Sequence, residues 1–190
     1  MVARLDRLCH KLIGPVYAPY MNLRLDTDVL LCILLSLLLT GCHAPLQSPL
    51  SNTQPTSRAL ALAVLAALTT QDIDQLESLA LNGQEFREVV WPELPSSRPE
   101  RGVPVSYAWN DLHQKSTNAL RRLVSRWGGR TYTLLDVSYD GETTHYETFQ
   151  VHRETRLHVR DASGEEHEVH FYGSTLVRDS EFKIFSFVVD

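Results

Sequence analysis

The Gly128-Gly129 pair divides the chain into two parts with different hydrophobic periods. Before it, apolar residues recur every three to four positions, as they do along one face of a helix. After it, apolar residues form short stretches separated by turns rich in Gly, Asp and Ser, as in strands. Helices followed by a run of strands predict an α+β fold, with N-terminal helices packed on an antiparallel sheet.

The part before Gly128 carries the signals of several helix starts and ends. The predicted helical segments are 58–68, 72–81, a short piece around 86–90 and 105–127, with an irregular Pro-rich loop at 93–104. Their predicted N-terminal caps are Thr56 or Ser57, a capping box of Thr69 with Asp72, and Asn82 with Glu85.

The part after Gly129 contains four segments rich in β-branched and aromatic residues. We expect strands at 130–139, 146–160, 166–177 and 182–189, with turns at 140–141, 161–164 and 178–181. The last strand is apolar on both faces, so we expect it to be central or covered. Joined in sequence order, these strands would form an antiparallel meander.

An apolar run of eleven residues, Val29 to Leu39, precedes the helical part and ends at Leu39-Thr40-Gly41-Cys42. A helix needs about 20 apolar residues to cross a membrane, so this run has the length of a signal-peptide core. Its ending resembles the lipobox of bacterial lipoproteins. The resemblance implies cleavage before Cys42 and lipidation of its thiol, which makes Cys42 the predicted lipidation residue. A buried core helix and an uncleaved anchor are the alternatives.

The predicted organisation is a signal peptide at 1–41, a lipidated and flexible tether at 42–56, and one α+β domain at 57–190. The sequence offers two starts. Met1 would begin an unusually long signal, whereas Met21 would make residues 1–20 a wrongly assigned start, which we favour. His43 follows Cys42 where Asp would favour the inner membrane. The lipoprotein resemblance therefore implies the bacterial cell envelope, at the periplasmic face of the outer membrane.

Charge and cysteine content exclude several kinds of binding partner and metal site. From Cys42 onward the chain has 149 residues, with 14 basic and 20 acidic side chains and a net charge of −6. A chain without a basic patch is a poor nucleic-acid binder, and membrane attachment would come from acyl chains rather than charge. Cys42 would be the last cysteine, so the domain has no disulfide and no zinc–thiolate site.

The segment from Ala66 to Leu76 and the closing strand, Glu181 to Val189, resemble parts of the nuclear transport factor 2-like (cystatin-like) superfamily. This resemblance covers residues 57–190 and implies that the antiparallel sheet is curved and encloses a cone-like pocket together with the long helix. The superfamily includes isomerases, dehydratases and plain binding proteins, so the fold alone does not select among them. The Pro-rich loop and the helix at 105–127 depart from the family pattern.

An aromatic and polar group around the start of the long helix is the first candidate site. Its ligand-binding candidates are Trp91, Tyr107 and Trp109. His113 lies four residues after Trp109 and so is its neighbour on a helix, whereas Asp111 points elsewhere. One interpretation is a pocket mouth with His113 as general base or hydrogen-bond donor. The alternative is that both tryptophans belong to the core and His113 to its boundary.

A second candidate is the polar face of the predicted strand at 146–160, which includes Tyr146 and His152. It is either a polar pocket floor or the solvated outer face of a sheet. No metal site is predicted, because His152 and His158 would lie about 20 Å apart along one strand at about 3.3 Å per residue. His167 and His170 would point to opposite faces.

No catalytic or cofactor-binding motif is found, and no cofactor is expected. The leading hypothesis is a non-enzymatic, lipid-anchored envelope protein that binds a small ligand or another envelope protein. The alternative is a small isomerase or lyase that uses His113 or His152 with Tyr107 or Tyr146. A structural assembly subunit is a third option, and it would carry a large exposed apolar patch.

Overall fold

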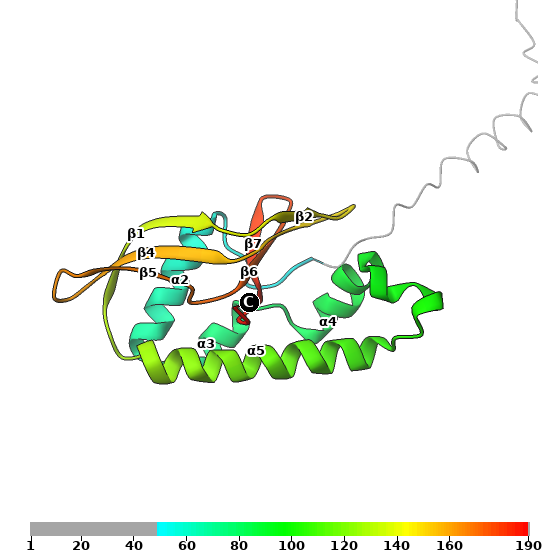
Figure 1. The fold of residues 1–190 in the computed structure, drawn as a ribbon, viewed down its shortest axis with the longest axis horizontal. Helices are drawn as coiled ribbons and strands as arrows, with labels where there is room; N and C mark the ends of the chain where they lie inside the picture. Colours follow the sequence, from blue (N-terminus) through cyan, green and yellow to red (C-terminus); the bar gives the residue numbers. More distant parts are fainter. Residues whose placement is uncertain (1–48, 190) are drawn as a thin grey trace, which may run out of the picture. The chain divides into compact units, whose positions relative to one another are not determined.

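The computed structural model describes residues 49–189, and Figure 1 shows that the helices come first and the strands last, as predicted. The helices are α2 (Ser57–Thr70), α3 (Ile73–Ser78), α4 (Gly83–Glu85) and α5 (Val105–Trp127), with a π-helical turn η1 (Phe86–Val90) and three 3₁₀ turns η2 (Trp91–Glu93), η3 (Pro95–Ser97) and η4 (Pro99–Arg101). The signal peptide, Cys42 and most of the predicted tether lie outside the described residues. No helix in residues 49–189 has the length and apolar character that crossing a membrane requires.

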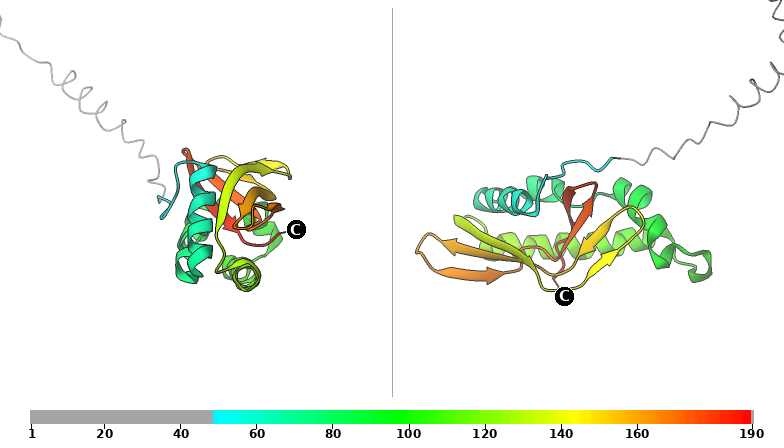
Figure 2. Two further views of the ribbon diagram at one scale, coloured as in Figure 1. Left: turned by 90° about the vertical axis from the view of Figure 1, so that its left-hand side faces the viewer. Right: turned by 90° about the horizontal axis from the view of Figure 1, so that it is seen from above.

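The strands form two antiparallel sheets. They are β1 (Tyr132–Tyr139), β2 (Thr143–His145), β3 (Gln150–His152), β4 (Thr155–Asp161), β5 (Glu166–Val169), β6 (Ser174–Arg178) and β7 (Glu181–Ser186). One sheet has the order β1-β4-β5 and the other β2-β3-β6-β7. The predicted α+β class is confirmed, whereas the single meander is wrong. In Figures 1 and 2, α5 lies on the opposite side of the unit from β1 and β4.

Side-chain caps explain where the first helices begin. The Thr56 hydroxyl accepts a hydrogen bond from the backbone of Ala59, which starts α2. Asn82 and Glu85 form the predicted capping box at α4. The predicted box of Thr69 with Asp72 is wrong, because Asp72 alone caps α3. The Thr69 hydroxyl instead donates to the carbonyl oxygens of Leu65, within α2, and of Arg130.

The predicted strand at 146–160 is two strands in different sheets. Glu154 takes a left-handed backbone conformation with φ of 53°, which breaks the chain between β3 and β4. The segment predicted at 166–177 also divides, into β5 and β6, with Gly173 at the junction. A Cβ on Gly173 would lie 1.6 Å from the carbonyl oxygen of Val188, so only glycine fits there. β2 was not predicted.

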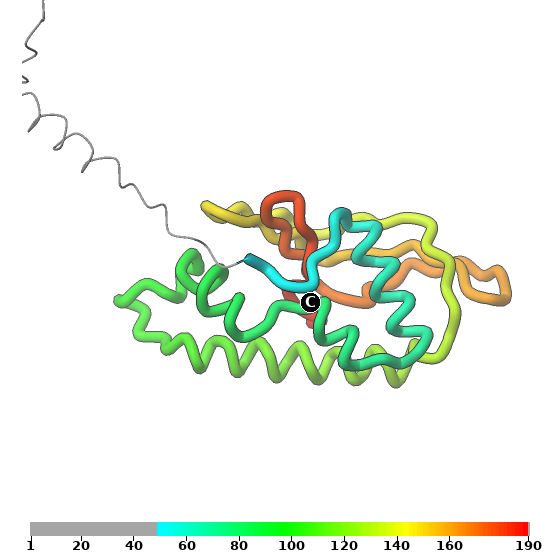
Figure 3. Tube along the Cα trace, turned by 180° about the vertical axis from the view of Figure 1, so that it is seen from behind, coloured from blue at the N-terminus to red at the C-terminus, as the bar shows by residue number. Residues whose placement is uncertain are grey.

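β7 is an edge strand whose free side is covered. Gln54 exchanges two backbone hydrogen bonds with Phe182, and residues 79–81 exchange two more with Ile184. Figure 3 shows the N-terminal segment running beside β7. Covering an edge in this way protects it from pairing with another chain. The prediction of a covered last strand is therefore confirmed, although the strand ends at Ser186.

The N-terminal boundary of the domain lies earlier than predicted. The tether was expected to run to residue 56, but Leu50 is buried and Gln54 pairs with β7. Two apolar clusters form the core. The first packs α2, α3 and the end of α5 against β1 and β4, and the second packs η1 against β3 and β6 and includes Leu50. Residues from 50 onward therefore belong to the folded unit.

Candidate functional site

A hollow of about 230 Å³ lies between α3, α4, the middle of α5 and the end of β7. We call it the Trp109 cavity. Its walls are lined by Glu77, Ala80, Leu81, Asn82, Gly83, Trp109, Leu112, His113, Ser116, Thr117, Leu120, Phe185 and Phe187. Two of the sequence-predicted residues, Trp109 and His113, therefore line one hollow.

Trp109 and His113 are stacked, with ring centroids 5.1 Å apart and an angle of 17° between the planes. This follows from their spacing of four residues on α5. Phe86 packs against the indole from another side, 5.4 Å away between centroids. A Cβ on Gly83 would lie 3.0 Å from the indole nitrogen of Trp109, so the glycine allows the helix start to approach the ring closely. The indole is thus held in place before any ligand arrives.

The polar groups around the Trp109 cavity fall into two kinds. Some serve the fold: the Ser116 hydroxyl accepts a hydrogen bond from the backbone of Phe187, and Asn82 caps α4. The side chains of Glu77, His113 and Thr117 form no hydrogen bond or ion pair within residues 49–189. Sequence reasoning missed Glu77 and Thr117, because they come from different helices and carry no motif.

A second hollow of about 340 Å³, which we call the Tyr107 cleft, lies beside the first. Trp91 and Tyr107 line it, and it shares Leu112 and Phe185 with the Trp109 cavity. Tyr107 is 68% exposed, and Trp91 is half-buried against the second apolar cluster. The predicted aromatic group is therefore distributed over two adjoining hollows.

The tryptophans also pack as the alternative interpretation expected. Trp91 and Trp109 are half-buried and contact the second apolar cluster, and His113 is exposed at the rim. Asp111 pairs with Lys115 at 2.8 Å and does not orient His113, as expected. Tyr107 and His113 line different hollows, so the structure does not place them in one hollow as the enzyme hypothesis requires.

His152 lies in β3 and Tyr146 in the turn between β2 and β3, and the two side chains contact different neighbours. His152 stacks on Tyr139 with centroids 4.4 Å apart, and its Nδ1 lies 2.8 Å from the Thr143 hydroxyl. Burial, together with the nearby charge of His145, lowers the pKa of His152 from its ordinary value of 6.5. Tyr146 stacks on the core residue Phe149 instead.

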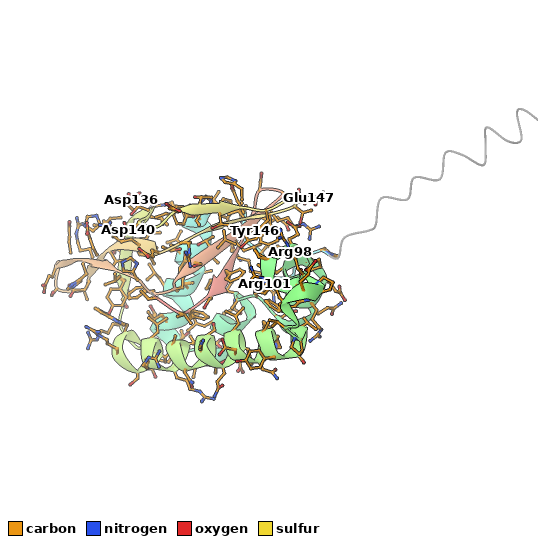
Figure 4. The ribbon with its side chains drawn as sticks, turned by 45° about the vertical axis from the view of Figure 1, so that its right-hand side comes forward. Arg98, Arg101, Asp136, Asp140, Tyr146 and Glu147 are labelled. Carbon is orange, nitrogen blue, oxygen red and sulfur yellow. The ribbon has the colours of Figure 1, made fainter. Side chains whose placement is uncertain are left out.

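The tip of the β2–β3 hairpin is held by the Pro-rich loop. The Glu93 carboxylate accepts hydrogen bonds from the backbone nitrogens of Glu147, at 2.6 Å, and Thr148, at 3.2 Å. Figure 4 shows Tyr146 and Glu147 at this tip, on the side of Arg98 and Arg101. The loop is therefore fixed in place, and it forms one wall of the Tyr107 cleft.

The polar face of β4 is a solvated network of ion pairs. Arg156 pairs with Asp140 and with Glu168, the latter at 2.9 Å, and Arg160 pairs with Glu166 at 2.6 Å. Figure 4 places Asp140 on the strand side of the unit, away from α5. This part of the predicted polar strand is therefore the outer face of a sheet rather than a pocket floor.

Three residues near the β4–β5 turn have potential metal-ligand atoms within 4.8 Å of one another: Asp161, Glu165 and His167. Sequence reasoning did not predict this group. Asp161 is already occupied, because it accepts hydrogen bonds from Ser163 and the backbone of Glu165 and lies 3.0 Å from His167. These bonds hold the pKa of Asp161 well below its usual range. They explain the group as a stabilised turn.

A buried ion pair was also missed. Lys183 is fully buried, and its Nζ lies 3.3 Å from Oε1 of Glu85, which is 3% exposed. The same carboxylate accepts hydrogen bonds from the backbone and hydroxyl of Ser51, and Lys183 donates to the Ser51 carbonyl. Burial lowers the pKa of Lys183, and Glu85 opposes that shift. The pair fixes the N-terminal segment to the domain.

Comparison of the chain with protein-family models, curated proteins and solved structures gives no match.

Proposed function

We propose that this chain is a lipid-anchored envelope protein whose domain binds a small molecule in the Trp109 cavity. The observation that carries the binding proposal is the set of unpaired polar side chains around an apolar hollow. Glu77, His113 and Thr117 have no hydrogen-bond or ion-pair partner within residues 49–189, whereas other polar groups at the same hollow are used by the fold. A few polar groups over apolar walls are typical of ligand sites.

The cavity limits the size and chemistry of the ligand. Its volume of about 230 Å³ lies just below the ~300 Å³ at which typical ligand pockets begin, so the ligand is small. Leu112, Phe185 and Phe187 provide apolar walls for its body. The Glu77 carboxylate favours a donor group at the mouth, such as an amine or hydroxyl. The adjoining Tyr107 cleft gives room for a longer substituent.

The anchor part of the proposal is supported by the lipobox-like Leu39-Thr40-Gly41-Cys42 and the apolar run before it. Cys42→Ala should leave the precursor uncleaved and without lipid, as measured by mass and by fatty-acid labelling; normal labelling of this variant would exclude the anchor. The cone-like pocket of the nuclear transport factor 2-like superfamily stays a prediction, and ligand binding at α5 does not depend on it.

The binding proposal is tested by native and denatured mass spectra of the protein extracted from its own host. The denatured mass gives the first residue and the acyl chains. A native mass that exceeds it by the mass of a small molecule supports the proposal and provides the compound for titration. An excess the size of a protein would replace it with a partner-binding function, and no excess would contradict it.

Two variants then locate the bound compound. Thr117→Leu fills the cavity from α5, where leucine is also the better helix former, so affinity should fall at least about tenfold without loss of stability. Asn118→Leu is the matched control, because Asn118 is an exposed neighbour that does not line the cavity. Equal affinities of the two variants would place the ligand elsewhere.

A further inference from the structure

A third hollow, of about 650 Å³, lies along the last turns of α5. We call it the arginine groove. Its apolar lining includes Leu123, Trp127, Phe171 and Phe187. Its titratable side chains are Arg121, Arg122, Arg126 and His170, and no carboxylate of the described residues lines it. A basic groove is unexpected on a chain whose net charge from Cys42 onward is −6.

No ion pair among the described residues uses the three arginines, and two of them lie outside the last turn of α5. Arg121, Arg122 and Arg126 are exposed and form no ion pair with another residue in 49–189; Arg126 lies over the Trp127 ring, 5.1 Å from its centroid. The helix dipole favours cations only in the last turn, and the helix ends at Trp127, so it does not account for Arg121 and Arg122. Arg156, on the sheet, is by contrast paired with carboxylates.

The groove combines these charges with an apolar floor. Arg122 and Arg126 are four residues apart and therefore neighbours on one helix face, and Leu123, Phe171 and Phe187 lie beneath. His170 at the rim is held by the Thr155 carbonyl at 3.0 Å and lies 3.5 Å from Asp140. Arginine and tryptophan around an apolar centre are the residues most enriched in binding hot spots.

We propose that the arginine groove docks a short acidic segment of a partner protein, whose carboxylates meet the arginines and whose apolar side chain covers the floor. Guanidinium groups bind carboxylates bidentately. Fields of exposed charges decay within about 8 Å at physiological salt, so a short segment in the groove meets mainly the local positive charge. A membrane surface would face the whole domain, whose net charge repels anionic lipid.

The choice of a protein over a lipid surface also rests on the proposed anchor. Figures 1 and 3 show the described N-terminal segment beginning nearer the start of α5 than its end. The described residues begin at Pro49, seven positions after Cys42, a distance that the chain can span over at most about 25 Å. α5 spans 23 residues, or about 35 Å. The link from a lipidated Cys42 is therefore shorter than α5, and it attaches to the domain nearer the end of α5 that lies away from the arginine groove.

The three tryptophans allow the sites to be tested separately, because Trp91, Trp109 and Trp127 line the cleft, the cavity and the groove respectively. The full chain with Trp91→Phe and Trp109→Phe, in phosphatidylcholine nanodiscs, leaves Trp127 as the reporter. The probe is an acetylated and amidated Asp-Leu-Asp-Leu-Asp peptide, and its control has Asn for each Asp. The acidic peptide should change Trp127 emission saturably, and the control peptide should not.

Charge removal at the groove should weaken this binding. Arg122→Gln with Arg126→Gln should raise the Kd at least about tenfold, because the peptide carboxylates would lose their charge-assisted hydrogen bonds to both guanidinium groups. Arg98→Gln with Arg101→Gln removes the same charge from the distant loop and should change the Kd less than about twofold. Arg122→Lys with Arg126→Lys should keep part of the affinity that the Gln pair loses, which separates lost charge from lost folding.

Four outcomes would overturn the proposal: no response at millimolar peptide, equal binding of the Asn peptide, equal effects of the two Gln pairs, or an equal emission change from phosphatidylglycerol nanodiscs without peptide. The last would assign the groove to lipid. Trp127 does not line the Trp109 cavity, so these four outcomes do not depend on whether that cavity holds a ligand. The two proposals can therefore fail independently.

Discussion

Replacing Glu85 by Gln should destabilise the protein strongly, because it leaves the Lys183 ammonium without its carboxylate. Lys183 is fully buried, and its remaining partners are the carbonyl oxygens of Ser51 and Ser78. The substitution keeps the size of the side chain. It removes a negative charge and leaves fewer acceptors for the donors that now converge on Glu85, including the backbone N–H of Asn82.

The size of the effect follows from the proton that Lys183 can release. An uncompensated ammonium can become neutral at a cost of about 1.36 kcal/mol for each pH unit below its ordinary pKa of 10.5. This sets a ceiling on the lysine contribution of about 5 kcal/mol at pH 7 and about 2 kcal/mol at pH 9. Breaking a buried ion pair typically costs about 3–5 kcal/mol, so we expect a loss in that range at pH 7.

Urea unfolding of wild type, Glu85→Gln, Lys183→Met and the double variant at pH 7 and pH 9 measures these values. Lys183→Met should lower the free energy of unfolding by less than half as much as Glu85→Gln does, because Glu85 keeps its hydrogen-bond donors from Ser51 and Asn82. The double variant should resemble Lys183→Met. A Glu85→Gln cost that is the same at both pH values would refute the reasoning, since the unpaired charge would then not be its cause.

The N-terminal segment should respond to the same substitution. Its backbone is tied to the domain by the Ser51 contacts with the ion pair and by the two hydrogen bonds between Gln54 and Phe182. In Glu85→Gln we expect faster amide hydrogen exchange at Ser51 than in wild type, with Gln54 less affected because β7 holds it. Unchanged exchange at Ser51 would show that the pair does not hold the segment.

Three further substitutions test the interior. Burial raises the pKa of Tyr172, so above pH 10 the unfolded chain loses a proton that the folded chain keeps, and stability falls as pH rises. Tyr172→Phe should make that fall smaller in urea titrations at alkaline pH. It should lower the free energy of unfolding by under about 1 kcal/mol, since the buried hydroxyl lacks a hydrogen-bond partner among the described residues. The lowered pKa of His152 means that below pH 6.5 the unfolded chain binds the proton more readily, so stability falls as the pH falls. His152→Phe should make the free energy of unfolding fall less steeply between pH 7 and 5, and the same slope as in wild type would contradict this. Gly173→Ala should cost about 3 kcal/mol or more, because its Cβ would overlap the Val188 carbonyl; a melting temperature within a few degrees of wild type, by circular dichroism, would exclude the clash.

The helical half could be predicted because its signals are local. Periodicity and the terminal glycines give α5 its observed bounds, and Thr56 and Asn82 cap the helices they were expected to cap. The sheet arrangement could not be predicted in the same way. The division into β3 and β4 depends on the backbone at Glu154, and that between β5 and β6 on the passage of Val188 beside Gly173. Strand-like composition does not show where a chain changes sheets.

The candidate site could be predicted only where its residues share one helix. Trp109 and His113 are adjacent because they share one helix, and their spacing alone shows it. Glu77 and Thr117 reach the same cavity from α3 and α5, whose packing is a tertiary property. Lys183 carried a usable signal: a lysine inside an otherwise apolar strand needs a buried partner. The capping role of Glu85 obscured which residue that partner would be.

β7 connects all of these features, and this determines which variants are informative. Lys183 holds the N-terminal segment, Phe185 lines both the Trp109 cavity and the Tyr107 cleft, and Phe187 lines the cavity and the arginine groove. A substitution in or just after β7 would therefore alter several sites together, and a lost activity could not be assigned to one of them. Side chains on α5 are separable, because Thr117 lines the cavity and Arg122 lines the groove. Variants at these two positions, compared with their exposed controls, change one hollow each while leaving the shared strand intact.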